Sequence, residues 1–277
     1  MVVSSHTLRF LGTAAYCGVP SFYCGCKACE EALRNPAAQR TCSALLIRGR
    51  QNTLIDAGPD LRMQLSLARA SDIHQVLLTH EHADHIGGIA QMEFYVRFRL
   101  DQPLPIYAPA YTLEAVSQQF GFMRDTLELH ELKAWQTIEF DGLRYTALPA
   151  SHGVQTFGYL IEQGTDLADS AGSGSISKRV AYFPDTGPPA SAVAEAIRGV
   201  DYFIIDASFN GRNQKPEAHL SIDEAIQLSI ELEAKKTFLT HLTMHYDEPI
   251  TTYELQQYLS PYAGSILAAN DGLELRL

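Results

Sequence analysis

The sequence predicts an α/β layered fold, in which β-sheets are covered by α-helices. Short apolar runs that favour strands alternate with stretches of helical periodicity along the whole chain. The two halves of the 277-residue chain share this rhythm, and no linker composition separates them. An apolar fraction of 46% and a charged fraction of 19% are typical of a globular protein with a sizeable core. We therefore expect a single domain spanning residues 1–277.

In the first half, turn and capping signals divide the chain into strands and helices. Pro36 ends the first helix, Arg48-Gly49-Arg50 turns a hairpin, and Asp141-Gly142 turns a second one. The expected elements are a strand at 8–11, a helix up to Arg34, strands at 43–47 and 52–55, a helix at 59–70, a strand at 76–78, a helix through Ile89, Met92, Phe94 and Phe98, a strand at 104–108, a helix at 111–120 and paired strands within 135–149.

The second half continues the alternation and ends with two short strands. The expected elements are strands around 156–162 and 179–183, a helix at 189–198, a strand at 201–206, a helix at 221–233, a strand at 236–240, a helix at 251–259 and strands at 265–269 and 273–276. Asn270-Asp271-Gly272 is a turn signal between the last two strands. For residues 165–178 we expect a flexible hairpin loop without a chemical role.

The charge balance and the short apolar runs restrict the partners of this protein. A formal net charge of −11 argues against a general nucleic-acid-binding surface, which would be basic. It does not exclude a small anionic substrate, because bound divalent cations dominate the local field of a site. No apolar run approaches the ~20 residues of a membrane span, and the start of the chain lacks the features of a signal peptide. We expect a cytoplasmic protein, and exposed edge strands would allow a homodimer.

Residues 75–88, with the sequence QVLLTHEHADHIGG, contain the strongest functional signal. The apolar run at 76–78 predicts a buried strand. Four candidate metal ligands follow it within six residues: His80, His82, Asp84 and His85. The two histidines His80 and His82 can point to one side of a strand end and the other two ligands to the opposite side, so that two cations share one loop. In a chain with ten histidines, this density favours a metal site over a solvated polar loop.

Further polar residues follow apolar strands elsewhere in the chain. Asp56 follows the run at 53–55, and His152, Asp185 and His241 each follow a predicted strand in the same way. A single residue of this kind is more often a hydrogen-bonded strand end than a ligand. Together they repeat one arrangement, in which loops at one edge of the sheets collect polar ligands.

These motifs resemble, in order and approximate spacing, those of the metallo-β-lactamase-fold hydrolases. The matching segments are LIDAG (54–58), THEHADH (79–85), SHG (151–153), PDTG (184–187) and LTH (239–241). The resemblance covers nearly the whole chain and implies an αββα sandwich with its active site at one edge of the paired sheets. It also implies two metal sites, one held by His80, His82 and His152 and the other by Asp84, His85 and His241, with Asp185 bridging both. Asp56 matches a residue that supports the ligands without binding metal.

Two metals that share a carboxylate favour hydrolysis. They lower the pKa of a bridging water so that hydroxide exists at neutral pH, and they neutralise charge on the attacked group. A ligand set of His and Asp side chains fits Zn²⁺, Mn²⁺ or Fe about equally. We therefore expect two divalent ions, and we count Asp84 among the catalytic residues as well as among the ligands.

A second candidate metal site lies near the start of the chain, in a loop at about 17–36. Cys24, Cys26 and Cys29 place three thiolates within six residues, which favours a structural zinc with one further ligand. Three reduced core cysteines or a redox pair are the alternatives. We expect Cys42 to be an ordinary buried thiol.

The cysteine segment and the intact HxHxDH motif together resemble the PhnP family, the phosphoribosyl 1,2-cyclic phosphate phosphodiesterases. In that family three cysteines and a histidine just after the last catalytic-metal histidine bind a structural zinc. The resemblance therefore implies His245 as the fourth ligand, with Cys17 and Asp247 as alternatives. It also implies that His219 protonates the leaving oxygen, a task that suits the near-neutral pKa of histidine. The alternative for His219 is a surface histidine before a helix that Ser221 caps.

We therefore predict a metal-dependent phosphodiesterase that acts on small cyclic phosphodiesters, with phosphoribosyl 1,2-cyclic phosphate as the substrate that the resemblance implies. A metal-bridging hydroxide would attack phosphorus, and His219 would protonate the departing alkoxide. The basic residues that could hold the substrate phosphate are Arg62, Arg97, Arg99, Arg212 and Lys215.

Three alternatives to this function are a tRNA 3′-processing nuclease of the RNase Z type, a cofactor-biosynthesis or carrier protein of the PqqB type, and a lactone or thioester hydrolase. The acidic composition disfavours the nuclease, which would need a basic RNA-binding arm. The intact ligands at residues 80–85 disfavour the carrier protein.

Overall fold

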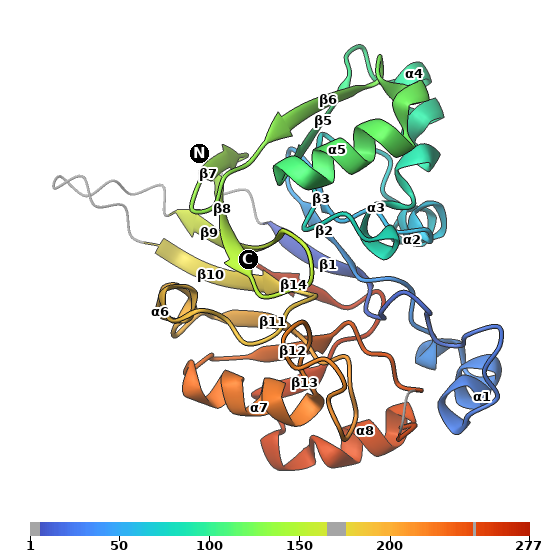
Figure 1. Ribbon diagram of the computed structural model, residues 1–277, viewed down its shortest axis with the longest axis vertical. Helices are drawn as coiled ribbons and strands as arrows, with labels where there is room; N and C mark the ends of the chain where they lie inside the picture. Colours follow the sequence, from blue (N-terminus) through green and yellow to red (C-terminus); the bar gives the residue numbers. More distant parts are fainter. Residues whose placement is uncertain (1–5, 165–175, 246–247) are drawn as a thin grey trace, which may run out of the picture.

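The computed structural model describes residues 6–164, 176–245 and 248–277. Within these ranges the chain forms two seven-stranded β-sheets (Figure 1). The first sheet contains, in spatial order, β14 (Glu274–Arg276), β1 (Thr7–Gly12), β2 (Ala44–Arg48), β3 (Thr53–Ile55), β4 (Gln75–Leu77), β5 (Leu104–Ala108) and β6 (Leu127–Glu131). Strands β14 to β3 pair antiparallel, and β3 to β6 pair parallel.

The second sheet repeats this pattern with the other half of the chain. It contains, in spatial order, β13 (Ile266–Ala268), β12 (Thr237–Thr240), β11 (Tyr202–Asp206), β10 (Ile176–Phe183), β9 (Thr156–Gly164), β8 (Leu143–Ala150) and β7 (Thr137–Phe140). Strands β7 to β10 pair antiparallel, and β10 to β13 pair parallel. Both sheets therefore present the carboxyl ends of parallel strands, where ligand-binding loops gather.

Helices cover the outer face of each sheet. Beside the first sheet lie α2 (Leu61–Ala68), α3 (Ala83–Ile86), η2 (Ile89–Met92), α4 (Glu93–Arg99), α5 (Ala110–Gln119) and η3 (Gly121–Met123). Beside the second sheet lie α6 (Ser191–Ile197), α7 (Ile222–Glu231), α8 (Thr252–Tyr258) and η4 (Ser260–Tyr262). Helix α1 (Lys27–Arg34) stands to the side of the sheets and is followed by η1 (Pro36–Ala38) (Figure 1).

The two sheets pack face to face through a buried core. Along β2, Leu45 and Ile47 contribute to the cluster between the sheets, whereas Leu46 packs under the helices of the first sheet. The facing strands supply Tyr159 and Phe238 to the same intersheet cluster. Because side chains alternate between the two faces of a strand, a strand that is apolar throughout is buried on both sides. These layers confirm the predicted αββα fold.

A close approach of two glycines positions the helix that carries the histidine motif. A Cβ atom on Gly88 would clash with the backbone oxygen of Gly58. The backbone N–H of Gly88 also donates to the carbonyl of Ala57 at 2.8 Å. A side chain at residue 88 would therefore push α3 and its ligands away from the end of β3.

Most predicted elements are present with ends shifted by a few residues, and three differ. The helix expected through Ile89 and Phe98 is divided into α3, η2 and α4. Strand β6, with the polar sequence LELHE, was not predicted, because it is an edge strand that is mostly exposed and lacks an apolar run. Strands β13 and β14 lie in different sheets, so that the turn at 270–272 carries the chain from one sheet to the other. The loop expected at 165–178 falls largely on residues 165–175, outside the described residues.

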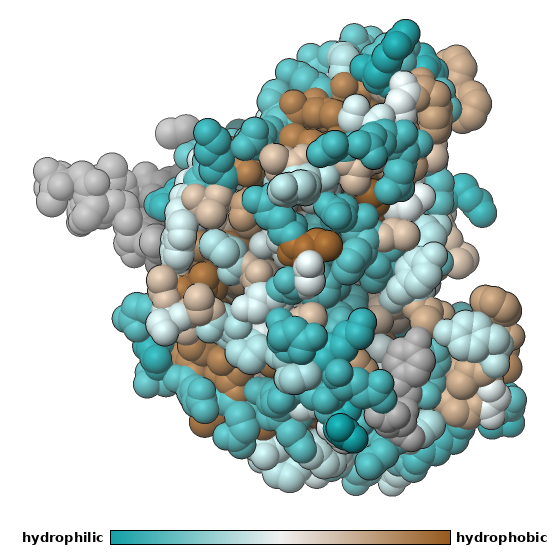
Figure 2. All heavy atoms as spheres, viewed as in Figure 1, coloured by the Kyte–Doolittle hydropathy of each residue, from teal (hydrophilic) through white to brown (hydrophobic). Residues whose placement is uncertain are grey.

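The molecular surface shown in Figure 2 is covered mainly by hydrophilic residues, with hydrophobic ones in small groups. Among the described residues, no helix has both the length and the apolar character that crossing a bilayer requires. The longest of the α-helices, α5 and α7, have 10 residues each, about half of the number that a membrane span needs.

Candidate metal centre

The predicted site residues meet at one edge of the sandwich, between the two sheets. Each lies at or just beyond the end of a strand: Asp56 after β3, His80 to His85 after β4, His152 after β8, Asp185 after β10 and His241 after β12. They come together because the strand ends of both sheets open onto the same edge. The structure therefore brings together all seven residues that were predicted as ligands of a binuclear centre.

One cluster contains the three histidines His80, His82 and His152. Nδ1 of His82 lies 3.0 Å from Nε2 of His80 and 3.2 Å from Nε2 of His152. Nε2 of His80 also lies 3.3 Å from Oδ2 of Asp185. Ligand atoms around a tetrahedral zinc with Zn–N bonds of 2.0–2.1 Å are separated by about 3.3 Å. The nitrogens thus have the spacing of atoms that share one cation.

The other cluster joins Asp84, His85 and His241, and it shares Asp185 with the first. Oδ2 of Asp84 lies 3.3 Å from Nε2 of both His85 and His241. Oδ2 of Asp185 lies 3.6 Å from Nε2 of His241. Nε2 of His85 is buried and has no hydrogen-bond partner among the described residues. A buried nitrogen of this kind costs free energy unless a cation accepts its lone pair, so the residues present fit a binuclear metal site.

Hydrogen bonds behind the clusters orient the imidazoles. Nδ1 of His85 donates to Oδ2 of Asp56 at 2.8 Å, and Nδ1 of His152 donates to the carbonyl of Ala218 at 2.9 Å. Nδ1 of His241 lies 2.9 Å from Oγ of Ser208. Because Nδ1 of each ring is engaged, Nε2 is the nitrogen that faces the cluster. Asp56 thus lies behind the ligands, where the sequence comparison expected it.

The pKa shifts in the two clusters favour binding of a positive charge. Burial and the neighbouring His85 lower the pKa of His80 to about 3, so that this imidazole is neutral and offers a lone pair. Burial disfavours the carboxylate of Asp84, but His85 and His241 outweigh this and hold the pKa of Asp84 well below its usual range. Burial also disfavours a charged His85, yet Asp84 and Asp56 raise its pKa. When no metal is bound, the protonated His85 balances the charge of the carboxylates. A bound divalent cation would take over this role.

His219 lies beside both clusters. Its Nδ1 is 2.9 Å from Oδ1 of Asp185 and 3.0 Å from Oδ2 of Asp206. Burial alone would lower the pKa of His219, but these two carboxylates raise it to about 10. Its side chain is 17% exposed and lines a cavity at the metal centre. His219 is therefore not the surface histidine of the alternative interpretation, although Ser221 does cap α7.

A cavity of about 400 Å³ opens onto the metal centre. Two aromatic residues, Tyr16 and Phe209, line it together with Lys215. Of the five basic residues considered above, Lys215 alone lines this cavity. Arg97 is instead held by Asp125 and Glu93 on the surface. The structure thus selects one cation from a group among which the sequence could not choose.

Asp206 is a site residue that our reading of the sequence missed. It is fully buried, and it accepts hydrogen bonds from His219 Nδ1 at 3.0 Å and from the backbone N–H of Ser208 at 2.8 Å. It follows the apolar run of β11 in the same way as Asp56 follows β3. The strand-end pattern that indicated the other ligands was therefore present here as well.

The three cysteines form a second, separate cluster. Sulfur atoms of Cys24, Cys26 and Cys29 all lie within 4.8 Å of one another. Nδ1 of His245 is 3.4 Å from Sγ of Cys29, so His245 lies where a fourth ligand is needed. Burial, together with the neighbouring thiols, raises the pKa of Cys29 to about 12. A bound cation would favour the thiolate instead, and the three thiols with His245 fit a structural metal site.

The other thiols and the alternative ligands lie elsewhere. Sγ of Cys17 is 3.0 Å from the hydroxyl of Tyr23, and Cys17 lines the cavity at the metal centre. Asp247 is outside the described residues. Cys42 is 1% exposed, and burial raises the pKa of its thiol. Cys42 has the surroundings expected of an ordinary buried thiol.

Comparison with known proteins identifies the family. A family model described as the beta-lactamase superfamily domain matches residues 51–242, which is more than half of the chain. The chain belongs to the metallo-β-lactamase superfamily. Together with the buried His/Asp clusters, this membership supports a metal-dependent hydrolase.

Two solved structures resemble the whole chain. A crystal structure of a diphosphatase from the PhnP family has a TM-score of 0.82 and 25% identity, over 99% of this chain and 97% of that chain. Zinc-bound PqqB from Methylobacterium extorquens has a TM-score of 0.78 and 23% identity, over 98% of this chain and 100% of that chain. The first structure confirms the resemblance to the PhnP family, and the second is evidence for the fold alone.

Curated relatives share a similar level of sequence identity with this chain. An octanoyltransferase from Porphyromonas gingivalis is 25% identical over 95% of this chain, which spans only 50% of the relative's length. A ribonuclease Z from Archaeoglobus fulgidus is 25% identical over 77% of this chain and 85% of the relative's length. The names of these two relatives denote different activities.

Proposed function

We propose that this protein is a binuclear-metal phosphodiesterase that hydrolyses small cyclic phosphodiesters, with phosphoribosyl 1,2-cyclic phosphate as the leading substrate. The observation that carries the proposal is one cavity in which two ligand clusters share Asp185, beside His219 and Lys215. The similarity to a PhnP-family diphosphatase over the whole chain supports it. Two divalent cations at the clusters, Zn²⁺ or Mn²⁺, would activate a water molecule and neutralise charge on the phosphate oxygens.

In this proposal His219 is the proton donor to the leaving oxygen. Its Nδ1 is held by Asp206 at 3.0 Å, which leaves Nε2 as the nitrogen available to the cavity. Asp206 is itself held by the backbone N–H groups of Ser208 and Leu220. The imidazole is thereby fixed in one orientation before substrate binds, which general acid catalysis requires.

Lys215 would bind a phosphate oxygen that does not react. Lys215 lines the cavity together with Phe209 and Gln214. An ammonium group recognises a phosphate as a point charge. The substrate is therefore a small anion that fits about 400 Å³, within the ordinary range of ligand pockets.

Hydrolysis of a diphosphate is the second candidate function, because the similar PhnP-family structure is described as a diphosphatase. Both reactions break a P–O bond and need the same clusters and the same proton donor. They differ in the leaving group, which is an alkoxide in one reaction and a phosphate in the other. A leaving phosphate needs less protonation than an alkoxide, so His219 would matter less for a diphosphate.

The test compares substrates with the metal-loaded protein. The panel contains bis(p-nitrophenyl) phosphate, a 2′,3′-cyclic nucleotide, phosphoribosyl 1,2-cyclic phosphate, a nucleoside diphosphate, a precursor tRNA and a lactone. We expect the highest kcat/KM for the cyclic phosphoribosyl ester and loss of activity in the presence of a chelator. Absence of phosphodiesterase activity with Zn²⁺, Mn²⁺ and Fe²⁺ would refute the proposal. Preferential turnover of the diphosphate, the tRNA or the lactone would assign the corresponding alternative.

A further inference from the structure

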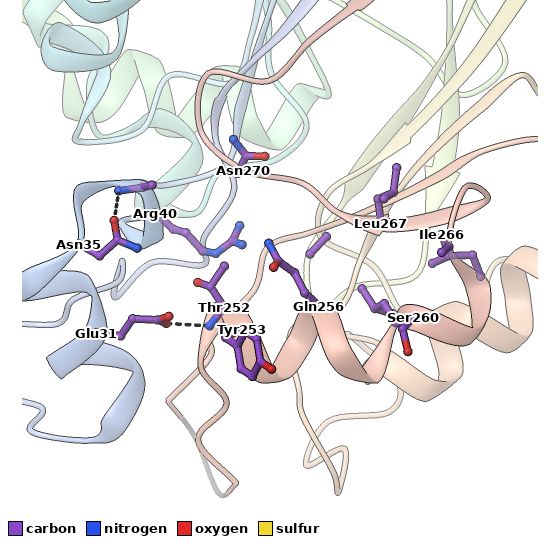
Figure 3. Close-up of a pocket in the computed structure, with 14 residues that line it drawn as sticks. Glu31, Asn35, Arg40, Thr252, Tyr253, Gln256, Ser260, Ile266, Leu267 and Asn270 are labelled. Atoms are coloured by element: carbon purple, nitrogen blue, oxygen red, sulfur yellow. Dashed lines mark hydrogen bonds between the residues drawn. The ribbon is translucent and has the colours of Figure 1, made fainter.

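A second cavity lies apart from the metal centre, between the segment that follows α1 and the α8–β13 segment (Figure 3). Its volume is about 660 Å³, and it shares no lining residue with the cavity at the metal centre. Helix α1 is fastened to α8 beside it, because Lys27 pairs with Glu254 at 2.7 Å and Glu31 accepts the backbone N–H of Thr252 at 2.7 Å. The cavity is thus formed by segments that are distant in the sequence and held together by specific contacts.

Among the residues that the structure describes, Arg40 is the one cation that lines this cavity. Its side chain is 4% exposed and points into the space beside Thr252 and Gln256 (Figure 3). Nη1 donates to Oγ1 of Thr13 at 2.8 Å and to the carbonyl of Ala269. Nε has no hydrogen-bond partner among the described residues, and none of their carboxylates forms an ion pair with Arg40. Buried guanidinium groups are almost always paired, so one edge of Arg40 is left for a ligand.

Two further polar residues, Thr252 and Gln256, line the same space. Oγ1 of Thr252 is buried and has no hydrogen-bond partner among the described residues. The amide of Gln256 extends toward Arg40 (Figure 3). The wall opposite these groups is apolar and includes Leu259, Ile266 and Leu267. The cavity therefore offers hydrogen-bond donors at one end and an apolar surface at the other.

The charges around Arg40 restrict the class of ligand. Burial lowers the pKa of Arg40, and the nearby carboxylates of Asp271 and Glu31 oppose that shift. Glu31 lines the cavity itself. These two negative charges would repel a phosphate dianion more strongly than a monocarboxylate, which carries half the charge. A carboxylate is also the planar partner that a guanidinium edge recognises best.

We propose that this cavity binds a small organic monocarboxylate, with its carboxylate on Arg40 and its apolar body against the wall formed by Leu259, Ile266 and Leu267. Gln256 and Thr252 hydrogen-bond to the carboxylate oxygens. The site is separate from the metal centre and does not depend on the function proposed for that centre. A volume of about 660 Å³ accommodates a body of several carbons or one ring.

The test is calorimetric titration of the metal-loaded protein with hexanoate, with its neutral analogue hexanamide and with inorganic phosphate. We expect hexanoate to bind with a Kd below about 1 mM and hexanamide to bind at least about tenfold more weakly. Absence of saturation by hexanoate, or equal binding of the two compounds, overturns the proposal.

Substitutions locate the binding. Ala263→Phe narrows the cavity at an exposed position, and Gln256→Ala removes the amide, so both should weaken hexanoate binding by about tenfold or more. Gln257→Ala is the matched control, because Gln257 is exposed on the same helix but does not line the cavity.

Arg40→Gln should abolish hexanoate binding. Circular dichroism checks that this variant folds, because Nη1 of Arg40 also donates to the carbonyl of Ala269. Hexanoate binding that Ala263→Phe leaves unchanged would place the ligand elsewhere, for example on the catalytic metals. If phosphate binds more tightly than hexanoate and Ala263→Phe abolishes phosphate binding, the ligand is not a monocarboxylate.

Discussion

A single carboxylate, that of Asp56, organises the base of the metal centre. It is fully buried and accepts hydrogen bonds from His85 Nδ1 at 2.8 Å and from the backbone N–H of Thr79 at 2.8 Å. Oγ1 of Thr79 also donates to it and lies 3.0 Å from Nδ1 of His80. One side chain therefore orients a histidine of each cluster. The backbone of Asp56 has φ of 65°, which asparagine also tolerates.

Asp56→Asn should weaken metal binding without unfolding the protein. Thr79 N–H and His85 Nδ1 bond to different oxygens of Asp56, and an amide has only one acceptor oxygen, so the ring of His85 loses its fixed tautomer. Loss of a residue that supports a ligand typically costs 10- to 100-fold in metal affinity, which competition with a chelator would measure. Asp72→Asn, on the surface, is the control. Equal metal affinity in the two variants would contradict this role of Asp56.

His219→Ala should lower kcat by about 10²- to 10⁴-fold toward a substrate with a poor leaving group. Its metal content should stay unchanged, because His219 meets Asp185 through Nδ1 and is not one of the seven predicted ligands. Elemental analysis and steady-state kinetics together provide the measurement. His130→Ala is the control, because His130 is partly exposed and does not line the cavity. Loss of metal from the His219 variant would show that it is a ligand and not the acid.

At the scale of elements, α1 depends on its surroundings for stability. It has 8 residues and no side-chain hydrogen bond at its N-cap, Cys26, and isolated helices of fewer than about 12 residues are marginal in water. Contacts with α8 hold one side of it, and the cysteine cluster holds its first turn. A bound zinc would therefore cross-link α1 to the loop that contains His245.

Cys26→Ser should remove one metal ion per chain and destabilise the protein. Loss of a structural zinc should lower the Tm by roughly 5–10 °C for a stability loss of about 3 kcal/mol, as read by thermal denaturation and elemental analysis. Cys17→Ser is the matched control, because Cys17 lies in the same loop but not in the cysteine cluster. An unchanged metal content in Cys26→Ser would favour the alternative of reduced core cysteines.

At the scale of the molecule, Asp141 joins the two sheets at a point outside their shared core. This residue, in the turn between β7 and β8, accepts the backbone N–H of Arg50 at 2.6 Å and Nε of Arg50 at 2.7 Å. It also lies 3.1 Å from Nε2 of His6, which is 3% exposed. Arg50 belongs to the turn between β2 and β3. The hairpin turns of the two sheets are thus tied to one carboxylate.

Asp141→Asn should lower the free energy of unfolding at pH 7 by about 1–3 kcal/mol. Burial disfavours the carboxylate of Asp141, but bonds from Arg50, Gln51 and His6 outweigh this and lower its pKa. Because the folded-state pKa is the lower one, the stabilisation is complete above the usual aspartate pKa of about 4 and is lost as the pH falls through the folded value.

The difference between wild type and Asp141→Asn should therefore be constant from pH 5 to 8 and shrink below about pH 4. Urea denaturation of chelator-treated protein measures it without interference from metal loss at low pH. Glu139→Gln, at an exposed position of β7, should have an effect near zero. A difference that grows as the pH falls would contradict the assigned direction of the pKa shift.

The local part of the site could be predicted from the sequence. His80, His82, Asp84 and His85 lie within six residues, so chain geometry alone keeps them within reach of two shared cations. The strand-end pattern and the family resemblance extended this set to His152, Asp185 and His241, which the structure brings to the same edge. The layered α/β class followed from the alternation of strands and helices, whereas the αββα arrangement was implied by the family resemblance.

Other features depended on packing between distant segments. Asp206 lies at the site because β11 pairs with β10. Lys215 is the basic residue, among the five considered, whose loop lies at the cavity. Strands β13 and β14, close in the sequence, separated into different sheets. Arg40 became a candidate ligand-binding residue only because α8 and β13 enclose it. Sequence by itself determined the chemistry of the metal centre, because its ligands are near neighbours or end strands. Tertiary structure decided which side chains line the cavity at the metal centre and the second cavity, because those contacts join residues that no local pattern relates.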